Sequence, residues 1–424
     1  MAIQVVVGVN WGDEGKGRIV DYLSKTSDFV VRYQGGNNAG HTVINKFGNF
    51  KLHLLPSGIF RPNVINVMGP GTVIDLEMLV KEIEEIEKSG IQMGDNYKIS
   101  NLSTICFPFH RLLDSYEEER LGKKRFGSTQ RGIAPAYGDR HMKRGIQLGE
   151  LLHPEYLKER LIDVVAWANI LITKVYNKPP IKIEEMAAWI ETYGNRVKKY
   201  ICDTNQLLEN AVLSKKNILF EAQLGALRDI YYGIYPFTTS SCCLSGFAQV
   251  GGGVFNYQRY SIIGVMKAYS TQIGEGLFVT ELKNAIGDRI REKGLEYGAA
   301  TGRPRRIGYF DAVASRYGVK LQSATKIALT KLDVLSKEKI IKICTHYKIG
   351  NKLIDKFPFN AELERAKPIY EELPGWTEDI TKIRNFEYLP KNAQKYVLRM
   401  EKLIGCPIRY ISVGPARGSI IIKK

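Results

Sequence analysis

The sequence lacks any run of about 18 uncharged apolar residues, the length that a membrane-spanning helix requires. Its six cysteines are scattered without a CxxC pair, which argues against a zinc ribbon, a redox-exchange protein or a disulfide scaffold and predicts mostly buried thiols. A Pro/Ser-rich linker, a low-complexity tract, an internal repeat and a basic tail are also missing. Because Asp13 and Glu14 appear before a signal-peptide pattern can form, we expect a cytoplasmic protein.

The composition is that of a large folded protein. The chain has 424 residues, of which 44% are hydrophobic and 10% aromatic, so disorder is excluded for most of it and a large core is available. We predict a single large α/β domain over residues 1–424 with subdomain insertions. The net charge of +17 favours anionic partners such as phosphorylated small molecules. Since the surplus is spread along the chain, a solvated lysine-rich surface explains it more simply, and neither nucleic acid nor a membrane is predicted as a partner.

Short β-branched runs alternate with segments of helical spacing. The runs that predict buried strands are residues 3–9, 28–33, 63–68, 217–221, 261–265 and 326–330. Residues 16–23 predict a helix, residues 42–55 a hairpin, and Asp75 caps a helix that Ser89 and Gly90 end. This order predicts a large, mainly parallel central sheet flanked by helices, with a nucleotide site like that of P-loop NTPases beyond the carboxyl ends of the strands.

A glycine-rich segment, GVNWGDEGKG at residues 8–17, joins the first predicted strand to the first helix. It differs from a Walker A loop because six residues instead of four separate Gly8 from the Gly15-Lys16 pair. Backbone N–H groups, the helix N-terminus and Lys16 can still hold phosphate oxygens. Asp13 would repel phosphate unless it binds Mg²⁺ or accepts a proton, so the segment predicts a phosphate site with a base or metal ligand. The alternative is a turn whose Asp and Lys are merely solvated.

A second glycine-rich turn, QGGNNAGHT at residues 34–42, follows another predicted strand. His41 lies in this turn, and if the turn faces the first segment, His41 can donate a proton or stabilise charge. A structural role for His41 is the alternative.

Two further segments carry polar chemistry. Thr330-Lys331-Leu332-Asp333 resembles the N/T-K-x-D element of GTPases, in which a carboxylate accepts two hydrogen bonds from guanine that adenine cannot supply; a four-residue match also arises by chance. The segment GAATGRPRR at residues 298–306 carries three arginines that can bind carboxylates or phosphates, unless it is a basic surface turn or faces nucleic acid.

Taken together, the motifs resemble those of the adenylosuccinate synthetase family. WGDEGKG, RYQGGNNAGHT, LHLLPSGI, GIAPAYGDR, YPFTTSS, KAYSTQIG, TGRPRRIGYFD, TKLDVL, YEELPGW and ISVGPAR occur in the family's order over nearly the whole chain. The resemblance implies a GTP-dependent ligase that joins L-aspartate to C6 of IMP through a 6-phosphoryl intermediate and releases adenylosuccinate, GDP and phosphate in AMP biosynthesis. It also implies a homodimer.

The resemblance assigns roles to individual residues. Asp13 is the expected base for N1 of the purine, His41 supports the transferring phosphoryl group, Lys16 spreads its charge, and Mg²⁺ is expected on the Asp13 side chain and the Gly40 carbonyl. The implied GTP contacts are Gly12, Glu14, Gly15, Gly17, Arg18, Gly40, Thr42, Arg305, Lys331, Leu332, Asp333, Ser412, Val413 and Gly414. The implied IMP contacts are Asn38, Thr129, Lys143, Leu224, Thr239 and Arg303. The implied aspartate contacts are Ala299, Ala300, Thr301, Gly302, Arg303 and Arg305.

The chain departs from the family pattern at several positions. Lys143 stands where the family has an arginine that reaches the phosphate across the dimer, and lysine lacks the bidentate fork. Leu224 stands where an amide faces the purine, with Gln223 as a less favoured substitute, and Pro304 replaces an arginine. Two alternatives therefore stay open: a diverged paralogue that uses another 6-oxopurine nucleotide or amine donor, and a guanine-nucleotide-binding protein without ligase activity.

Overall fold

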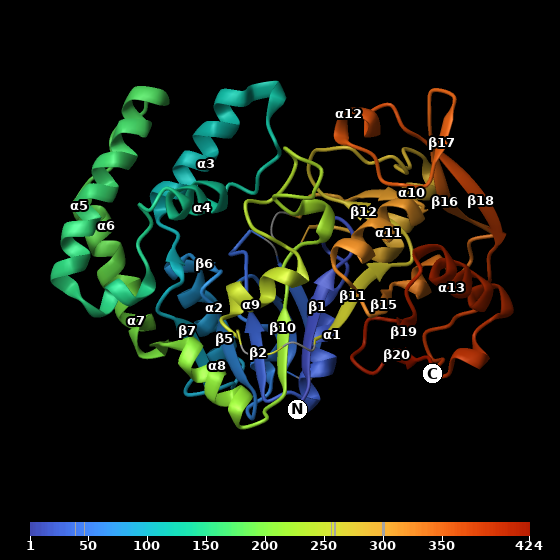
Figure 1. Cartoon of the computed structure of the whole chain (residues 1–424), viewed down its shortest axis with the longest axis horizontal. Helices are drawn as coiled ribbons and strands as arrows, with labels where there is room; N and C mark the ends of the chain where they lie inside the picture. The colour runs from blue at the N-terminus through green and yellow to red at the C-terminus, as the bar shows by residue number, and fades with distance from the viewer. Residues whose placement is uncertain (39, 46, 256, 258–259, 299–301) are drawn as a thin grey trace.

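A ten-stranded sheet forms the centre of the computed structural model (Figure 1), which describes residues 1–38, 40–45, 47–255, 257, 260–298 and 302–424. The strands, from one edge to the other, are β20 (Ile420–Ile422), β19 (Ile408–Ser412), β15 (Lys326–Thr330), β11 (Ser261–Lys267), β1 (Ile3–Gly8), β10 (Ile218–Glu221), β2 (Phe29–Arg32), β5 (Ile65–Met68), β7 (Tyr97–Ser100) and β9 (Ile201–Cys202). Neighbouring strands are parallel except β19 and β20, so the predicted mainly parallel sheet is confirmed.

Both faces of the sheet are buried, as the packing of β1 shows: its alternate residues belong to hydrophobic clusters on opposite faces. Val5 and Val7 join a cluster on one face that includes Leu208 of α8 (Thr204–Leu213). Val6 joins a cluster on the other face that includes Ile19 of α1 (Lys16–Leu23). A parallel sheet covered in this way requires nearly continuous apolar strands, which explains why the short β-branched runs predicted it.

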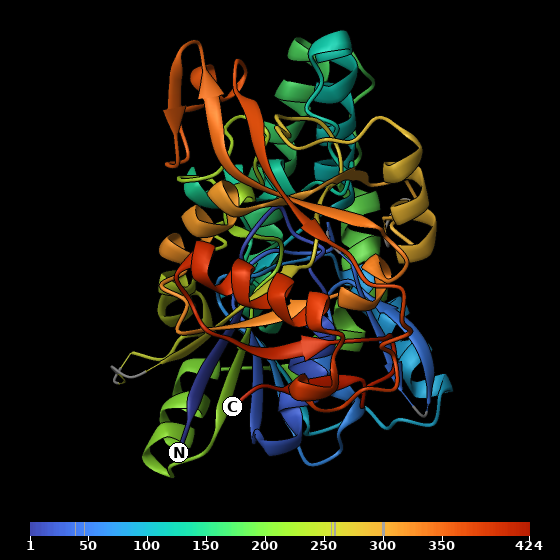
Figure 2. The same cartoon turned by 90° about the vertical axis from the view of Figure 1, so that its right-hand side faces the viewer.

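Two lobes flank the sheet. One lobe is helical, and its helices are α2 (Leu76–Lys88), α3 (Pro108–Leu121), α4 (Ile133–His141), α5 (Pro154–Ile170), α6 (Ile183–Trp189) and α7 (Asn195–Val197). All of these helices except α4 contribute residues to the largest core cluster, whereas α4 packs in a separate small cluster. The other lobe, orange to red and turned toward the viewer in Figure 2, contains α10 (Ala285–Gly294), β14 (Phe310–Asp311), α11 (Ala312–Leu321), β16 (Ile340–Ile349), β17 (Lys352–Ile354), α12 (Asn360–Leu363), β18 (Lys367–Pro374) and α13 (Lys391–Ile404). No helix among the described residues is both long and apolar enough to cross a membrane.

The remaining predicted elements are also present. The hairpin consists of the antiparallel strands β3 (His41–Asn45) and β4 (Gly48–Leu52). The carboxylate of Asp75 accepts a hydrogen bond from the Met78 N–H and so caps α2. Smaller elements complete the chain: β6 (Val73–Ile74), β8 (Thr104–Ile105), α9 (Ala248–Gly252), β12 (Ser270–Gln272) and β13 (Arg306–Gly308).

Several strands of the sheet end in a polar side chain at the same edge. Arg32, Glu221 and Lys267 are the last residues of β2, β10 and β11, and Thr330 and Ser412 are the last residues of β15 and β19. Because these strands run parallel, their carboxyl ends meet around the loop that follows β1. The fold therefore gathers charge at the edge where the two glycine-rich segments lie.

Asp311, a fully buried carboxylate, gives the fold a pH-dependent stability. It accepts hydrogen bonds from the Ala314 N–H at 3.0 Å and the Tyr347 hydroxyl at 2.6 Å, but burial prevails and raises its pKa from 3.8 to about 6. Its contribution to stability is therefore present below about pH 4 and is lost as pH rises through about 6, by at most ~3 kcal/mol.

We expect Asp311→Asn, which keeps the helix cap, to remove this component of the pH dependence between about pH 4 and 6. Thermal denaturation of both proteins across that pH range measures it. Parallel stability curves for the two proteins would contradict the assignment.

Candidate active site

The first glycine-rich segment forms a tight loop between β1 and α1. Gly12, Asp13 and Gly15 all have positive φ angles, of 99°, 59° and 92°. The carboxylate of Glu14 holds the loop from inside: it accepts hydrogen bonds from the Gly12 N–H at 2.8 Å and from Lys16 Nζ at 2.7 Å. The ammonium of Lys16 is thereby fixed at the N-terminus of α1, where helix dipole and charge favour phosphate.

The second glycine-rich segment packs directly on the first. A Cβ atom at Gly17 would lie 2.7 Å from His41 Cδ2, so only glycine allows the imidazole to approach α1 this closely. His41 Nε2 lies 3.7 Å from Glu221 Oε1. Burial, together with the charges of Arg32, His53 and Lys16, lowers the pKa of His41 well below its usual range. His41 is therefore a neutral imidazole at neutral pH and can donate one hydrogen bond without carrying charge.

We expect Gly17→Ala to displace the imidazole and to lower turnover at least ~10-fold, while alanine's higher helix propensity keeps the fold stable. Gly246→Ala, at a position with no atom within 4 Å of the added Cβ, is the matched control. Steady-state rates and melting temperatures of both variants test this. Equal rates for the two variants would mean that the approach of His41 to Gly17 does not matter for turnover.

Two cavities meet at Asp13. The first, of about 600 Å³, lies over the loop and α1, and the second, of about 680 Å³, extends between the sheet edge and the helical lobe. The residues that line both cavities are Asp13, Gly40, Leu224 and Gly298. A molecule in one cavity can therefore react with a molecule in the other only at this junction.

The structure distributes the predicted site residues between these cavities. The predicted GTP contacts that line the first are Glu14, Gly15, Gly17, Arg18, Gly40, Arg305, Lys331, Asp333, Ser412 and Gly414, together with Asp13, Lys16 and His41. The predicted IMP contacts that line the second are Asn38, Thr129, Leu224, Thr239 and Arg303. Gly302, predicted to contact aspartate, lines the first cavity.

Some predicted residues lie elsewhere. Leu332 and Val413 are buried in the hydrophobic core, and neither they nor Gly12 line a cavity. Ala299, Ala300 and Thr301 lie outside the described residues, as does the side chain of Thr42. Lys143 is exposed and lines neither cavity. Its neighbour Arg144 lines the second cavity, where its guanidinium stacks 3.7 Å from the ring of Trp167.

The first cavity is also lined by the element predicted to bind guanine. Asp333 lies there, and burial raises the pKa of its carboxyl. Lys331 has a left-handed backbone, with φ of 62°, and its Nζ donates to the carbonyl of Gly294 at 2.5 Å. Arg18 of α1 donates to Ser412 and to the carbonyl of Ala416 at 2.6 Å, which joins the loop after β19 to the same wall.

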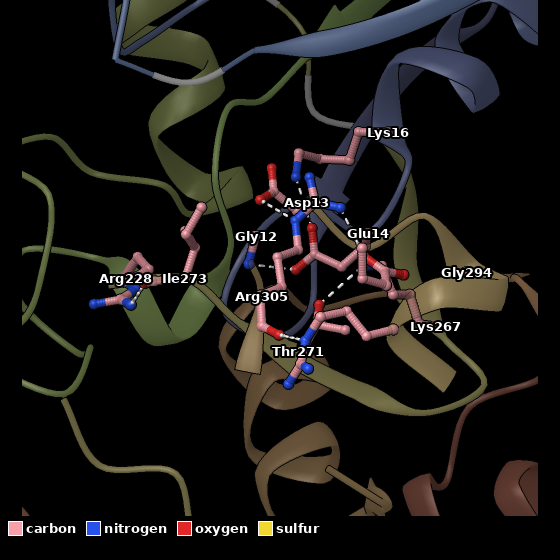
Figure 3. A network of polar contacts seen from close by, with 12 residues as sticks. Gly12, Asp13, Glu14, Lys16, Arg228, Lys267, Thr271, Ile273, Gly294 and Arg305 are labelled. Atoms are coloured by element: carbon pink, nitrogen blue, oxygen red, sulfur yellow. Dashed lines mark hydrogen bonds and ion pairs between the residues drawn. The ribbon is translucent and has the colours of Figure 1, made fainter. Parts of the chain in front are cut away.

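Arg305 lies between two carboxylates in the wall of the first cavity (Figure 3). Its Nε donates to Asp13 Oδ2 at 2.9 Å and its Nη1 to Glu296 Oε2 at 2.6 Å. Lys267 also donates to Glu296 Oε2, at 2.8 Å, and to Thr271 Oγ1 at 2.8 Å. Asp13 is thus linked through Arg305 to a buried charge network.

Several charged residues around the cavities were not predicted from the sequence. Lys267 and Glu221 have a sequence signal, because each is the single charged residue at the end of a buried apolar strand. Glu296 and Arg228 have no such sequence signal. Arg228 lines the second cavity, where its guanidinium donates to the backbone carbonyls of Phe237 and Ile273, and burial lowers its pKa to about 10.

Gln223 has a different role from the substitute amide considered in the sequence analysis. Its Oε1 accepts from the Gly36 N–H at 2.9 Å and its Nε2 donates to the Gly36 carbonyl at 2.7 Å. Both ends of this buried amide therefore hold the second glycine-rich segment. Leu224, with a φ of 61°, is the residue of this pair that lines both cavities, whereas Gln223 lines the first alone.

The residues at the junction fit a magnesium ion. Mg²⁺ in nucleotide sites takes one or two carboxylates and completes its shell with phosphate oxygens and water. The carboxylate of Asp13 and the backbone of Gly40 line both cavities at the same place. Within the described part of the chain, no cluster of three or more His, Cys, Asp or Glu side chains could hold a metal ion.

The fold and the site define an α/β class of protein in which a glycine-rich loop of the kind that binds phosphate lies where two cavities meet. A family model described as adenylosuccinate synthetase matches residues 5–421, and the chain belongs to this family. It is 46% identical over 422 residues to the adenylosuccinate synthetase of Heliobacterium modesticaldum, covering 99% of each chain, and 45% identical over 424 residues to that of Caldanaerobacter subterraneus subsp. tengcongensis, covering 100% of this chain and 99% of the relative. A solved structure of fully ligated adenylosuccinate synthetase from Plasmodium falciparum superposes with a TM-score of 0.94 at 37% identity, with 100% of both chains covered.

Proposed function

We propose that the protein joins L-aspartate to IMP at the expense of GTP and releases adenylosuccinate, GDP and phosphate. One observation carries the proposal: a phosphate-binding cavity and a second cavity of nucleotide size share one carboxylate, Asp13, at their junction. The full-length similarity to adenylosuccinate synthetases supplies the identity of the substrates. GTP occupies the first cavity and IMP the second.

The residues of the chain divide the chemistry between them. Asp13 accepts the proton from N1 of the purine, and the 6-oxygen then attacks the γ-phosphorus of GTP while the bond to the β-phosphate oxygen breaks. Lys16 at the N-terminus of α1 and neutral His41 stabilise the charge on the transferring group. The amine of aspartate next attacks C6, the C6–O bond breaks, and the oxygen leaves with phosphate. Arg303 lines the second cavity, and in this proposal it binds a carboxylate of aspartate.

Mg²⁺ is part of the proposal. The Asp13 side chain and the Gly40 carbonyl would hold it, and when bound it supplies charge neutralisation for the phosphoryl oxygens. We also propose a homodimer, in which the exposed Lys143 reaches the partner's IMP phosphate. Lysine supplies charge without the fork of an arginine, so IMP binding is expected to depend strongly on ionic strength.

The experiment that tests the proposal measures GDP formation with IMP, with and without aspartate, and repeats it with related 6-oxopurine nucleotides and other amine donors. We expect the fastest turnover with IMP and aspartate, and none without an amine donor. A faster rate with another pair would indicate a diverged paralogue instead, and GTP binding without aspartate-dependent turnover would indicate a binding protein.

A further inference from the structure

Glu296 is a fully buried carboxylate that the proposed chemistry does not use. It follows α10, and its side chain is 0% exposed. Three donors surround it: Tyr269 Oη at 2.5 Å from Oε1, and Lys267 Nζ at 2.8 Å and Arg305 Nη1 at 2.6 Å from Oε2. Such a site holds an ion only because every lone pair that faces the protein has a partner.

The negative charge of Glu296 is balanced by cations on two sides, one of them the side of the first cavity. Burial opposes its ionisation, but the charges of Lys267, Arg305 and Lys331 outweigh burial and lower its pKa to about 2. Lys267 and Tyr269 lie behind it, at the end of β11 and just after. Lys331 Nζ lies 4.0 Å from Oε1, and both Lys331 and Arg305 line the GTP cavity.

Glu296 and Arg305 are also joined through their backbones. The Arg305 N–H donates to the Glu296 carbonyl at 2.9 Å, in addition to the contact between their side chains. Two residues that are nine positions apart are therefore joined twice. Arg305 cannot leave the cavity wall unless both contacts break, and its Nε is aimed at Asp13.

We propose that Glu296 is a positioning residue, which fixes Arg305 and Lys331 on the wall of the first cavity and thereby sets the affinity for the nucleoside triphosphate. The inference rests on the proposed assignment of that cavity to GTP. Lys267 and Tyr269 alone would satisfy a carboxylate with a purely structural role, whereas the two cavity-facing cations have no structural need of it.

The test uses Glu296→Gln, which keeps the shape and removes the charge. We expect the KM and the Kd for GTP to rise ~10- to 100-fold, because the hydrogen bond from Arg305 loses the negative charge of its acceptor, while the KM for IMP changes less than about 2-fold. The matched control is Glu281→Gln. Glu281 accepts two hydrogen bonds, at 2.8 and 2.7 Å, from Arg306, the neighbour of Arg305, and neither residue lines the two cavities.

A second variant separates positioning from structural support. Lys267→Met combined with Glu296→Gln removes one buried charge of each sign. The double variant therefore leaves no unpaired lysine in the interior, and Arg305 still lacks a carboxylate at position 296. We expect this double variant to keep the raised Kd for GTP, and it provides the same test if Glu296→Gln alone does not fold. Recovery of wild-type affinity in the double variant, or an unchanged Kd in Glu296→Gln, would overturn the proposal.

Calorimetric titration with GTP gives the Kd without turnover, so this test does not depend on ligase activity. If the wild-type protein binds GTP but forms no GDP in the presence of IMP and aspartate, the proposed function fails and the role of Glu296 is still measured. If GTP binds with equal affinity to the wild-type protein and to both variants, the role of Glu296 fails and the proposed function stands.

Discussion

Asp13→Asn is expected to lower kcat at least ~10³-fold, the largest effect of any single substitution in the chain. Asparagine keeps the size of the side chain but can neither accept the N1 proton nor contribute a negative charge to Mg²⁺. General-base catalysis is worth about 10²- to 10⁴-fold, and the loss of a metal ligand adds to it. The rate of GDP formation at saturating GTP, IMP and aspartate measures the effect.

The control for Asp13→Asn is nucleotide binding. The loop around residue 13 is held by Glu14 and not by Asp13, since Glu14 accepts from both the Gly12 N–H and Lys16. The variant should therefore keep the fold and bind GTP within ~10-fold of the wild-type affinity in the absence of metal. Turnover close to wild type would remove Asp13 from the role of base.

Asp333→Asn is expected to weaken GTP binding ~10²-fold and to change which triphosphate is preferred. The carboxylate accepts two hydrogen bonds from the N1–H and the 2-amino group of guanine, and a site built to make such bonds rejects a base that cannot. Asparagine replaces one of the two carboxylate oxygens by an NH₂ group. This donor repels the 2-amino group of guanine but can donate to the 2-carbonyl oxygen of xanthine. Xanthosine triphosphate should therefore support the variant better than GTP does.

ATP is the control for Asp333→Asn, because adenine lacks both donors and gains nothing from either side chain. The ratio of kcat/KM for GTP, xanthosine triphosphate and ATP in both proteins measures the discrimination. An unchanged preference for GTP in the variant would show that the residues at the end of β15 do not bind the base.

Much of the fold could be predicted from the sequence because its signals are local. The strand before Gly8, the helix from Lys16 to Leu23 and the cap at Asp75 each depend on a few consecutive residues, and the structure confirms all of them. Parallel order followed from apolar strands without alternation. Apart from α2, which Asp75 caps, the two flanking lobes carried no comparable signal, since their cores form between residues far apart in the sequence.

The site was predictable where it is built from contiguous motifs. Asp13 and His41 each lie in a glycine-rich turn after a strand, and the structure brings both to one cavity, with His41 packed on Gly17. The positions of Glu296 and Arg228 beside the cavities were not predictable, because a lone Glu or Arg between ordinary neighbours gains its contacts only when distant loops come together. Gln223 shows the same limit: only the fold reveals that its amide holds Gly36.

In the proposed reaction, the 6-oxygen of IMP attacks the γ-phosphoryl group of GTP at the junction beside Asp13. An isotope experiment follows this oxygen: it starts from IMP labelled with ¹⁸O at position 6 and determines, by mass spectrometry, where the label is after complete conversion with GTP and aspartate. We expect the label in inorganic phosphate, one atom for each adenylosuccinate formed. Label that appears in water, with unlabelled phosphate, would contradict it.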